Sequence, residues 1–416
     1  GNTMKIQPLK GMCDYLPRQV ALRDYLQTTI LGVYRAAGYE RISTPALEDA
    51  ENIDKSEGGD NLNLIFKVLK RGEKLAAALD GGDEKALSDM GLRYDLTLPL
   101  SRYYACNRQN LFTPAKCIQT DRVWRAERPQ KGRLREFVQC DIDILGSASP
   151  TCEVDLICTT AKALRAIGMD RFTIHINDRA LLTGVLRKIG VPDEMRDSVC
   201  ISLDKLDKIG LDGVTAELTA KGLAPEVVGG IAALMADGTV SLEKAAAYLD
   251  DPAPAERLRF ITESVAAITD GTVPLVFDIT LIRGQGYYTG PVFEVRSEEF
   301  RGAIAGGGRY DRLIGKFLGE EVPAVGFSIG FERICAILAD RGFTPPTTRR
   351  RIAMLYYPDQ LVAAARAAEE MRGTADVSLI EKSGKVGKLI ARCEAYGFDA
   401  IAEVTAEGVT VKELTK

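Results

Sequence analysis

The sequence feature that most constrains the fold is a hairpin at residues 121–145. Residues 137–144 alternate between apolar and polar side chains, as in a β-strand whose two faces meet different surroundings. Residues 123–125 lead into residues 128–133, where a proline and a glycine indicate a loop. The stretch therefore predicts two antiparallel strands of a β-sheet.

The hairpin carries a local excess of positive charge. Its basic residues up to position 137 are Arg122, Arg125, Arg128, Lys131, Arg133 and Arg135, and its acidic residues are Asp121, Glu127 and Glu136. Guanidinium groups bind phosphate oxygens through paired hydrogen bonds and stay charged. Basic residues also simply cover sheet edges, so a phosphate site and a solvated edge both remain open from this stretch alone.

Composition sets the broad class. With 416 residues, the chain is long enough for more than one domain. Its net charge of −4 gives no global basic surface for nucleic acid, so such a partner must be met by local patches. Nine cysteines without a C-x-x-C spacing indicate reduced thiols and no zinc site. No apolar run is long enough for a membrane span, so we expect a cytoplasmic protein without membrane contact.

The chain contains one histidine, His175, in an alternating strand-like segment. A catalytic triad built on histidine would have to use this residue, and a lone histidine on a strand is more often a satisfied sheet residue than a base. Stabilisation of charge by arginines is therefore the better prediction for catalysis.

Further candidate residues lie in three segments. A predicted strand ends in Asp95 and Thr97, before a helix that Pro99 is expected to start, and Asp95 suits either a substrate ammonium group or a helix cap. The glycines of 284–290 and 306–308 let backbone approach a ligand closely. Arg333 lies in the first turn of a predicted helix, poised for a phosphate or base, or simply exposed.

These pieces, in this order, resemble the histidyl-tRNA synthetases, a class II aminoacyl-tRNA synthetase family. The resemblance covers nearly the whole chain, and two histidine-specific motifs make it specific. The matching stretches are 9–17 (the opening motif), 39–48 (the first class II motif), the hairpin (the second), 326–333 (the third), and 283–290 with 306–311 (the histidine motifs).

The resemblance implies an α+β fold with an antiparallel sheet flanked by helices. The catalytic core would occupy residues 1–177 and 255–340, separated by a helical insertion at 178–254. A short α/β domain resembling an anticodon-binding domain would follow at 350–416. The family also implies a homodimer.

The resemblance assigns roles residue by residue. The expected catalytic residues are Arg283 and Arg125. The expected ATP ligands are Arg125, Glu127, Arg133 and Arg333. The expected histidine ligands are Asp95, Thr97, Gln139, Asp143, Tyr287, Tyr288 and Tyr310. The expected contacts to the tRNA acceptor end are Gln130 and Arg135. ATP and Mg²⁺ would be the cofactors, and L-histidine and tRNA(His) the other partners; no metal-binding motif is present.

The expected chemistry is ATP-dependent formation of histidyl-adenylate, followed by transfer to tRNA. Several arginines and Mg²⁺ suit this reaction, because the attacking carboxylate is already ionised and needs no base. The sequence departs from many relatives at Gln285 and Gly286, at Val138, and in its short carboxy-terminal domain. A regulatory protein that binds histidine without catalysis, like the non-catalytic subunit of ATP phosphoribosyltransferase, is the alternative.

Overall fold

The computed structural model describes residues 3–56, 63–128, 133–282 and 287–415. These residues form two compact units, the first ending at Phe343 and the second beginning at Thr344. Each unit is described by itself.

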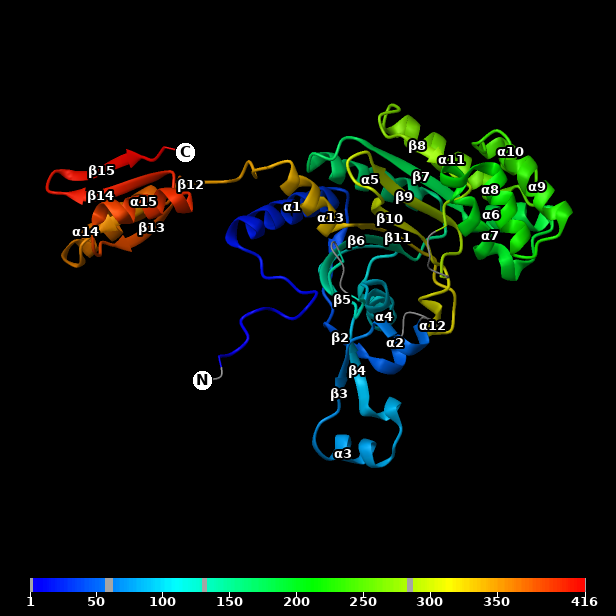
Figure 1. Ribbon diagram of the computed structural model, residues 1–416, viewed down its shortest axis with the longest axis horizontal. Helices are drawn as coiled ribbons and strands as arrows, with labels where there is room; N and C mark the ends of the chain where they lie inside the picture. Colours follow the sequence, from blue (N-terminus) through cyan, green and yellow to red (C-terminus); the bar gives the residue numbers. More distant parts are fainter. Residues whose placement is uncertain (1–2, 57–62, 129–132, 283–286, 416) are drawn as a thin grey trace. The chain divides into compact units, whose positions relative to one another are not determined.

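An eight-stranded sheet forms the centre of the first unit (Figure 1). Its strands, in spatial order, are β1 (Glu40–Arg41), β5 (Ala115–Trp124), β6 (Glu136–Leu145), β11 (Ala324–Ile329), β10 (Ala303–Arg309), β9 (Pro291–Ser297), β7 (Phe172–Asp178) and β8 (Leu275–Phe277). Neighbours are antiparallel except at the two edges, where β1 pairs with β5 and β8 pairs with β7 in parallel. The α+β fold with a mainly antiparallel sheet is thus confirmed.

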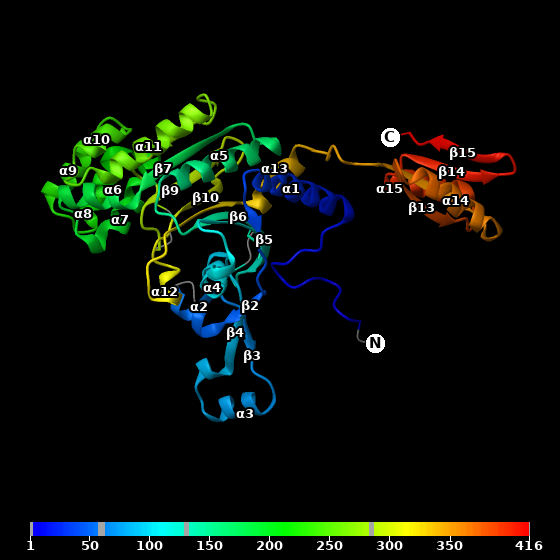
Figure 2. The same ribbon diagram turned by 180° about the vertical axis from the view of Figure 1, so that it is seen from behind.

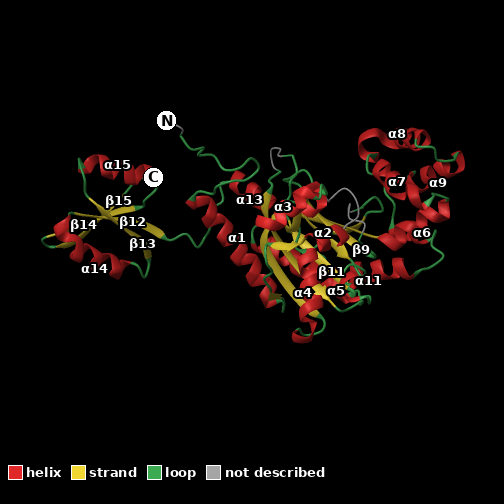
Figure 3. Ribbon diagram, turned by 90° about the horizontal axis from the view of Figure 1, so that it is seen from below, coloured by secondary structure: helices red, strands yellow, loops and turns green. Residues whose placement is uncertain are grey.

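One face of this sheet carries the main hydrophobic core. Alternate residues of β6, namely Cys140, Ile142 and Ile144, point into it, as the period of two requires. The helices packed on this side are α1 (Pro17–Ala36), α5 (Thr151–Ala166), α11 (Ala253–Ile268) and α13 (Phe331–Asp340). Figure 3 shows the strands enclosed by helices.

The other face of the sheet is more polar and meets a smaller layer. There α4 (Thr97–Asn107) packs Leu100 and Tyr104 against residues of β5 and β6. A three-stranded sheet lies beyond it, seen from behind in Figure 2. The elements of this layer are β2 (Leu47–Asp49), α2 (Ala50–Ser56), β3 (Lys67–Leu69), α3 (Gly72–Asp80), η2 (Glu84–Leu87), β4 (Ser88–Leu92), η3 (Arg108–Asn110) and α12 (Gly315–Leu318).

A group of helices lies between β7 and α11 along the chain. Its elements are α6 (Arg179–Ile189), η4 (Asp193–Met195), α7 (Arg196–Leu203), α8 (Leu206–Ala220), α9 (Pro225–Met235) and α10 (Leu242–Ala246). Asp178 starts this group, because its carboxylate accepts hydrogen bonds from the backbone amides of Ala180 and Leu181 and caps α6. No described helix combines the length and apolar character that crossing a membrane requires.

The second unit is a four-stranded sheet with two helices. Its elements are β12 (Arg350–Tyr356), η5 (Pro358–Gln360), α14 (Leu361–Met371), β13 (Ala375–Glu381), α15 (Val386–Tyr396), β14 (Ala400–Thr405) and β15 (Gly408–Glu413), with strand order β13-β12-β14-β15. Apolar residues cover both faces of β12, which lies inside the sheet between two parallel neighbours.

One local prediction was wrong. The strand expected to reach Thr97 ends at Leu92, and the helix expected at Pro99 begins at Thr97. The side chain of Arg93 donates hydrogen bonds to the carbonyls of Thr44 and Arg122, which turns the chain out of the strand. Pro99 then falls in the first helical turn, where its missing amide costs nothing.

Candidate active site

A cavity of about 360 Å³ opens on the polar face of the large sheet. Most of the residues that line it come from β6, β10 and β11, from the start of α4, from the segment that follows β5, and from the segment that begins at Tyr287. The lining residues are Leu64, Tyr94, Asp95, Thr97, Arg125, Glu127, Gln139, Asp141, Asp143, Tyr287, Tyr288, Gly306, Gly307, Gly308, Tyr310, Gly326, Phe327 and Ser328.

The floor of the cavity follows from strand register. Gln139, Asp141 and Asp143 alternate along β6 and therefore share one face. Asp143 lies opposite Gly326 of β11, which lies opposite Gly308 of β10. A Cβ at Gly326 would lie 2.1 Å from Oδ2 of Asp143. Glycine is therefore needed beside the carboxylate, and the floor stays open.

Asp143 is the electrostatic centre of this floor. Its side chain is buried, and the hydroxyl of Tyr310 donates a hydrogen bond to its Oδ2 at 2.5 Å. Burial raises the pKa of Asp143 to about 7, and the nearby charge of Asp95 acts in the same direction, although the bond from Tyr310 opposes it. A carboxylate held in this way can accept a hydrogen bond from a ligand and favours a ligand with positive charge.

Asp141 was missed by the sequence interpretation. It is buried one step along the same face, and burial together with the charge of Asp143 raises its pKa well above the ordinary value. Its Oδ1 has no hydrogen-bond partner among the described residues. The signal was present, since the alternation that places Gln139 and Asp143 on one face places Asp141 between them.

Three tyrosines form one wall. The rings of Tyr287 and Tyr288 have centroids 4.8 Å apart, and Tyr287 meets Tyr310 edge to face at 6.1 Å. Tyr288 also packs on Gly308, where a Cβ would lie 2.7 Å from its Cδ1. The wall leaves aromatic surface beside the carboxylate of Asp143.

Of the two roles that the sequence left open for Asp95, the structure shows the contact with the helix start, and binding of a substrate ammonium group stays a prediction. The Oδ1 of Asp95 accepts a hydrogen bond from the backbone amide of Leu98 at 3.2 Å, which helps to start α4, and the residue also lines the cavity. Thr97 lies two residues further along the chain and also lines the cavity.

Arg125 and Glu127 bring opposite charges to another part of the cavity. The Nε of Arg125 donates to the carbonyl of Tyr94 at 3.0 Å, and its guanidinium carbon lies 5.1 Å from the centre of the Phe137 ring. The carbonyl of Tyr94 and the ring of Phe137 thus hold the guanidinium of Arg125 in place. Its remaining N–H groups are of the kind that bind phosphate oxygens in pairs.

Three further expected site residues, Arg133, Arg135 and Arg333, are not among the described residues that line the cavity. Arg133 is exposed, and Arg135 donates from Nε to the carbonyl of Glu127 at 2.8 Å. Arg333 donates to the carbonyl of Ala303, and its guanidinium lies 5.5 Å from the centre of the Phe300 ring. Gln130 and Arg283 lie outside the described residues.

Comparisons of the sequence and of the structure with known proteins all match the chain to histidyl-tRNA synthetases. A family model described as Histidyl-tRNA synthetase matches residues 11–334. A histidine–tRNA ligase from Leifsonia xyli subsp. xyli is 40% identical over 97% of this chain and 96% of its own length. The crystal structure of histidyl-tRNA synthetase from Nostoc sp. PCC 7120 matches with a TM-score of 0.81 and 25% identity, covering 99% of this chain and 95% of that one.

A further structural match concerns the fold alone. A structure described as an ATP phosphoribosyltransferase regulatory subunit/histidyl-tRNA synthetase from Bacillus halodurans C has a TM-score of 0.76 at 20% identity. The match covers 94% of this chain and 97% of that one.

Proposed function

Because this chain belongs to the histidyl-tRNA synthetase family, we infer that it is a histidine–tRNA ligase, which uses ATP to join L-histidine to the 3′ end of tRNA(His). The observation that carries this inference is one cavity that combines a buried carboxylate, Asp143, with a fixed guanidinium, Arg125. The first group suits the side chain of histidine and the second suits the phosphates of ATP.

The histidine side chain is proposed to bind at Asp143, within the wall of Tyr287, Tyr288 and Tyr310. A neutral imidazole offers one N–H, and the buried carboxylate accepts it. An amino acid without such a donor would leave the carboxylate with the hydrogen bond from Tyr310 alone, which penalises its binding. Asp95 and Thr97 are proposed to hold the α-amino group, and Gln139 the rest of the amino acid.

ATP is proposed to lie along Arg125 and Glu127, with Arg133 and Arg333 approaching it when it binds. Mg²⁺ is proposed to arrive with the ATP phosphates as part of the substrate. Among the described residues, no three acidic, histidine or cysteine side chains are arranged to hold a metal ion.

The proposed reaction has two steps. An oxygen of the histidine carboxylate attacks the α-phosphorus of ATP, and pyrophosphate leaves with its electron pair. Arg125, together with Arg283 in the assignment from the family, neutralises the charge at phosphorus. A ribose hydroxyl at the 3′ end of the tRNA then attacks the carbonyl carbon of the adenylate, and AMP leaves.

The assembly and location are also proposals. A homodimer is supported by the exposed apolar side chains that precede or begin α1, namely Met4, Ile6, Leu9, Leu16 and Val20. Anticodon binding is assigned to the second unit, where Lys385 and Lys388 flank the start of α15. Free thiols at all nine cysteines support a cytoplasmic location.

Histidine-dependent exchange of pyrophosphate into ATP tests the first step, and charging of a tRNA(His) transcript tests the second. We expect exchange with L-histidine and none with other amino acids. The Arg125→Met variant should lose exchange but still bind histidine in calorimetry. Saturable histidine binding without exchange by the unmodified protein would replace the ligase with the regulatory alternative.

A further inference from the structure

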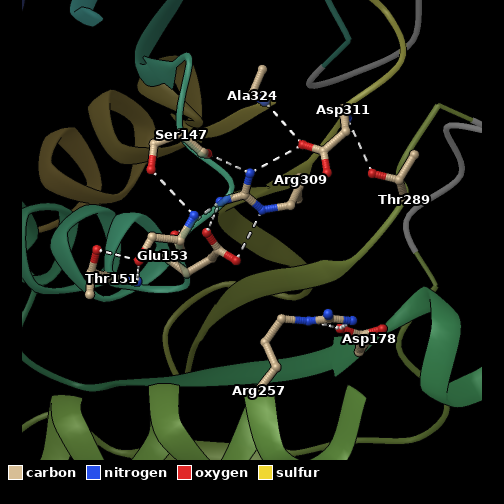
Figure 4. Close-up of polar contacts among 10 residues, drawn as sticks. Ser147, Thr151, Glu153, Asp178, Arg257, Thr289, Arg309, Asp311 and Ala324 are labelled. Carbon is tan, nitrogen blue, oxygen red and sulfur yellow. Dashed lines mark hydrogen bonds and ion pairs between the residues drawn. The ribbon is translucent and has the colours of Figure 1, made fainter. Parts of the chain in front are cut away.

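Arg309 is held by the most complete set of side-chain hydrogen bonds near the cavity (Figure 4). Its Nε and one terminal nitrogen donate to the two carboxylate oxygens of Glu153, at 3.2 and 2.5 Å. The other donors reach the carbonyls of Ser147 and Ser149 and the carboxylate of Asp311, at 2.9, 3.2 and 3.1 Å. All five guanidinium N–H groups are therefore used within the protein.

This arginine is a buried charge with no free donor for a substrate. Arg309 is 4% exposed and Glu153 is fully buried. Burial opposes the charged form of Arg309, but the bonds and charges of Glu153 and Asp311 outweigh it and raise the Arg309 pKa. A buried ion pair is weak evidence of stabilisation by itself, because desolvation offsets much of the attraction. The function of the Arg309–Glu153 pair is therefore inferred from its position in the fold and not from its contribution to stability.

Backbone hydrogen bonds connect Arg309 to the two segments that carry the tyrosines of the cavity wall, one with Tyr287 and Tyr288 and the other with Tyr310. The amide of Thr289 donates to the carbonyl of Arg309 at 2.8 Å, and the amide of Asp311 donates to Oγ1 of Thr289 at 3.1 Å. The amide of Tyr310 donates to the carbonyl of Ala324 at 2.7 Å, and Asp311 accepts from the amide of Ala324 at 3.1 Å. Tyr310, which bonds Asp143, thus lies between two anchored neighbours.

We propose that Arg309 and Glu153 are a positioning pair for the amino-acid pocket, which fixes Tyr310 and the segment Tyr287–Thr289 relative to Asp143 and thereby sets the affinity for histidine. The pair acts through these residues and does not touch the substrate. The proposal rests on the assignment of the cavity as the histidine site. It predicts that loss of the pair weakens histidine binding while ATP binding at Arg125 is spared.

The test replaces both members, since removing one would leave a buried charge unpaired and strongly destabilise the protein. In Arg309→Met/Glu153→Met, the histidine dissociation constant from calorimetry should rise at least tenfold, while the KM for ATP in pyrophosphate exchange stays within twofold. The matched control is the other ion pair in Figure 4, Asp178 with Arg257, whose Asp178 is also fully buried. Asp178→Asn/Arg257→Met should leave both constants within twofold.

Two further variants keep the proposal testable if the double variant does not fold. Thr289→Val keeps the ion pair and removes only the acceptor for the Asp311 amide, so the histidine dissociation constant should rise about threefold. Arg309→Lys should give a larger rise, because an ammonium group cannot reach both carbonyls and both carboxylates. Unchanged histidine affinity in these variants, or an equal loss in the control pair, would overturn the proposal.

Amide hydrogen exchange separates this proposal from the proposed function. If the unmodified protein binds no histidine, the assignment of the cavity has failed, but the pair can still be examined. The amides of Thr289 and Tyr310 should then exchange faster in the double or lysine variant than in the control. Equal exchange would refute the positioning role.

Discussion

Gly326 and Asp143 face each other across β11 and β6, and the space between them has no room for a methyl group. A Cβ on Gly326 would lie 2.1 Å from one carboxylate oxygen of Asp143, and no real Cβ approaches an oxygen so closely. The carboxylate can lie in the floor of the cavity because its neighbour is glycine.

Gly326→Ala should therefore selectively damage the proposed histidine site. The new methyl group forces Asp143 aside, and a forced shift in a packed region costs roughly 1–3 kcal/mol, or about 5- to 150-fold in histidine affinity. Calorimetric titration with histidine measures the loss. The control is Gly32→Ala in α1, where nothing lies within 4 Å of the added Cβ. Equal affinities for Gly326→Ala and the unmodified protein would show that Asp143 is not held as described.

Asp143→Asn should change the pH dependence of stability. The folded pKa of about 7 exceeds the value of about 3.9 for an unfolded aspartate, so the folded protein binds an extra proton between these values. Stability therefore falls as pH rises from about 4 to 7, and the full penalty persists above pH 7. Asparagine avoids this penalty, so the gain in Tm should be larger at pH 8 than at pH 5, by roughly 4 °C or more.

Thermal unfolding of both proteins at the two pH values gives the comparison. The exposed Asp80 provides a control, because Asp80→Asn removes a carboxylate in contact with solvent. A gain for Asp143→Asn that is the same at pH 5 and pH 8 would mean that Asp143 does not titrate in this range.

Arg125→Lys should weaken the use of ATP more than the binding of histidine. Lysine keeps the charge but cannot bond the carbonyl of Tyr94 and a phosphate in one fixed geometry. Loss of a charge-assisted hydrogen bond predicts a fall of roughly 10- to 100-fold in kcat/KM for ATP. Pyrophosphate exchange at varied ATP measures it, with histidine affinity from calorimetry unchanged.

The control for this prediction is Arg122→Lys in the same hairpin. Arg122 is exposed and lies 3.6 Å from Glu136, so its replacement should leave kcat/KM within about twofold. Similar losses in the two variants would point to a general effect of basic charge and not to a fixed phosphate ligand.

Arg23→Met should destabilise the first unit. Arg23 of α1 makes two hydrogen bonds with Glu332 of α13, at 2.6 and 2.8 Å, and Glu332 also accepts the amide of Val138 in β6. These side chains are only 15% and 22% exposed. Removal of Arg23 therefore leaves the poorly solvated carboxylate of Glu332 without its ion-pair partner. We expect a decrease of roughly 1–3 kcal/mol in the free energy of unfolding.

Urea unfolding followed by tryptophan fluorescence measures this loss, because the only tryptophan, Trp124, lies in the first unit. The pair Arg187–Asp193 is 62% and 55% exposed and provides the control. Arg187→Met should cost less than about 1 kcal/mol. Equal costs for the two variants would contradict the structural role given to Arg23.

The sequence predicted the main elements because they depend on local patterns. The period of two in residues 137–144 identified β6. The motifs also placed Asp95, Arg125 and Asp143 among the site residues, and the structure brings all three into one cavity. Their roles in binding remain predictions.

The tertiary structure decided what depends on contacts between distant segments. The sequence could not predict that Gly326 makes room for a carboxylate, or that Glu153 of α5 neutralises Arg309 of β10, which lies 156 positions further along the chain. Strand register and burial set these relationships. Both arise only when segments far apart in the sequence pack together and exclude water, whereas alternation and turns are fixed by neighbouring residues alone.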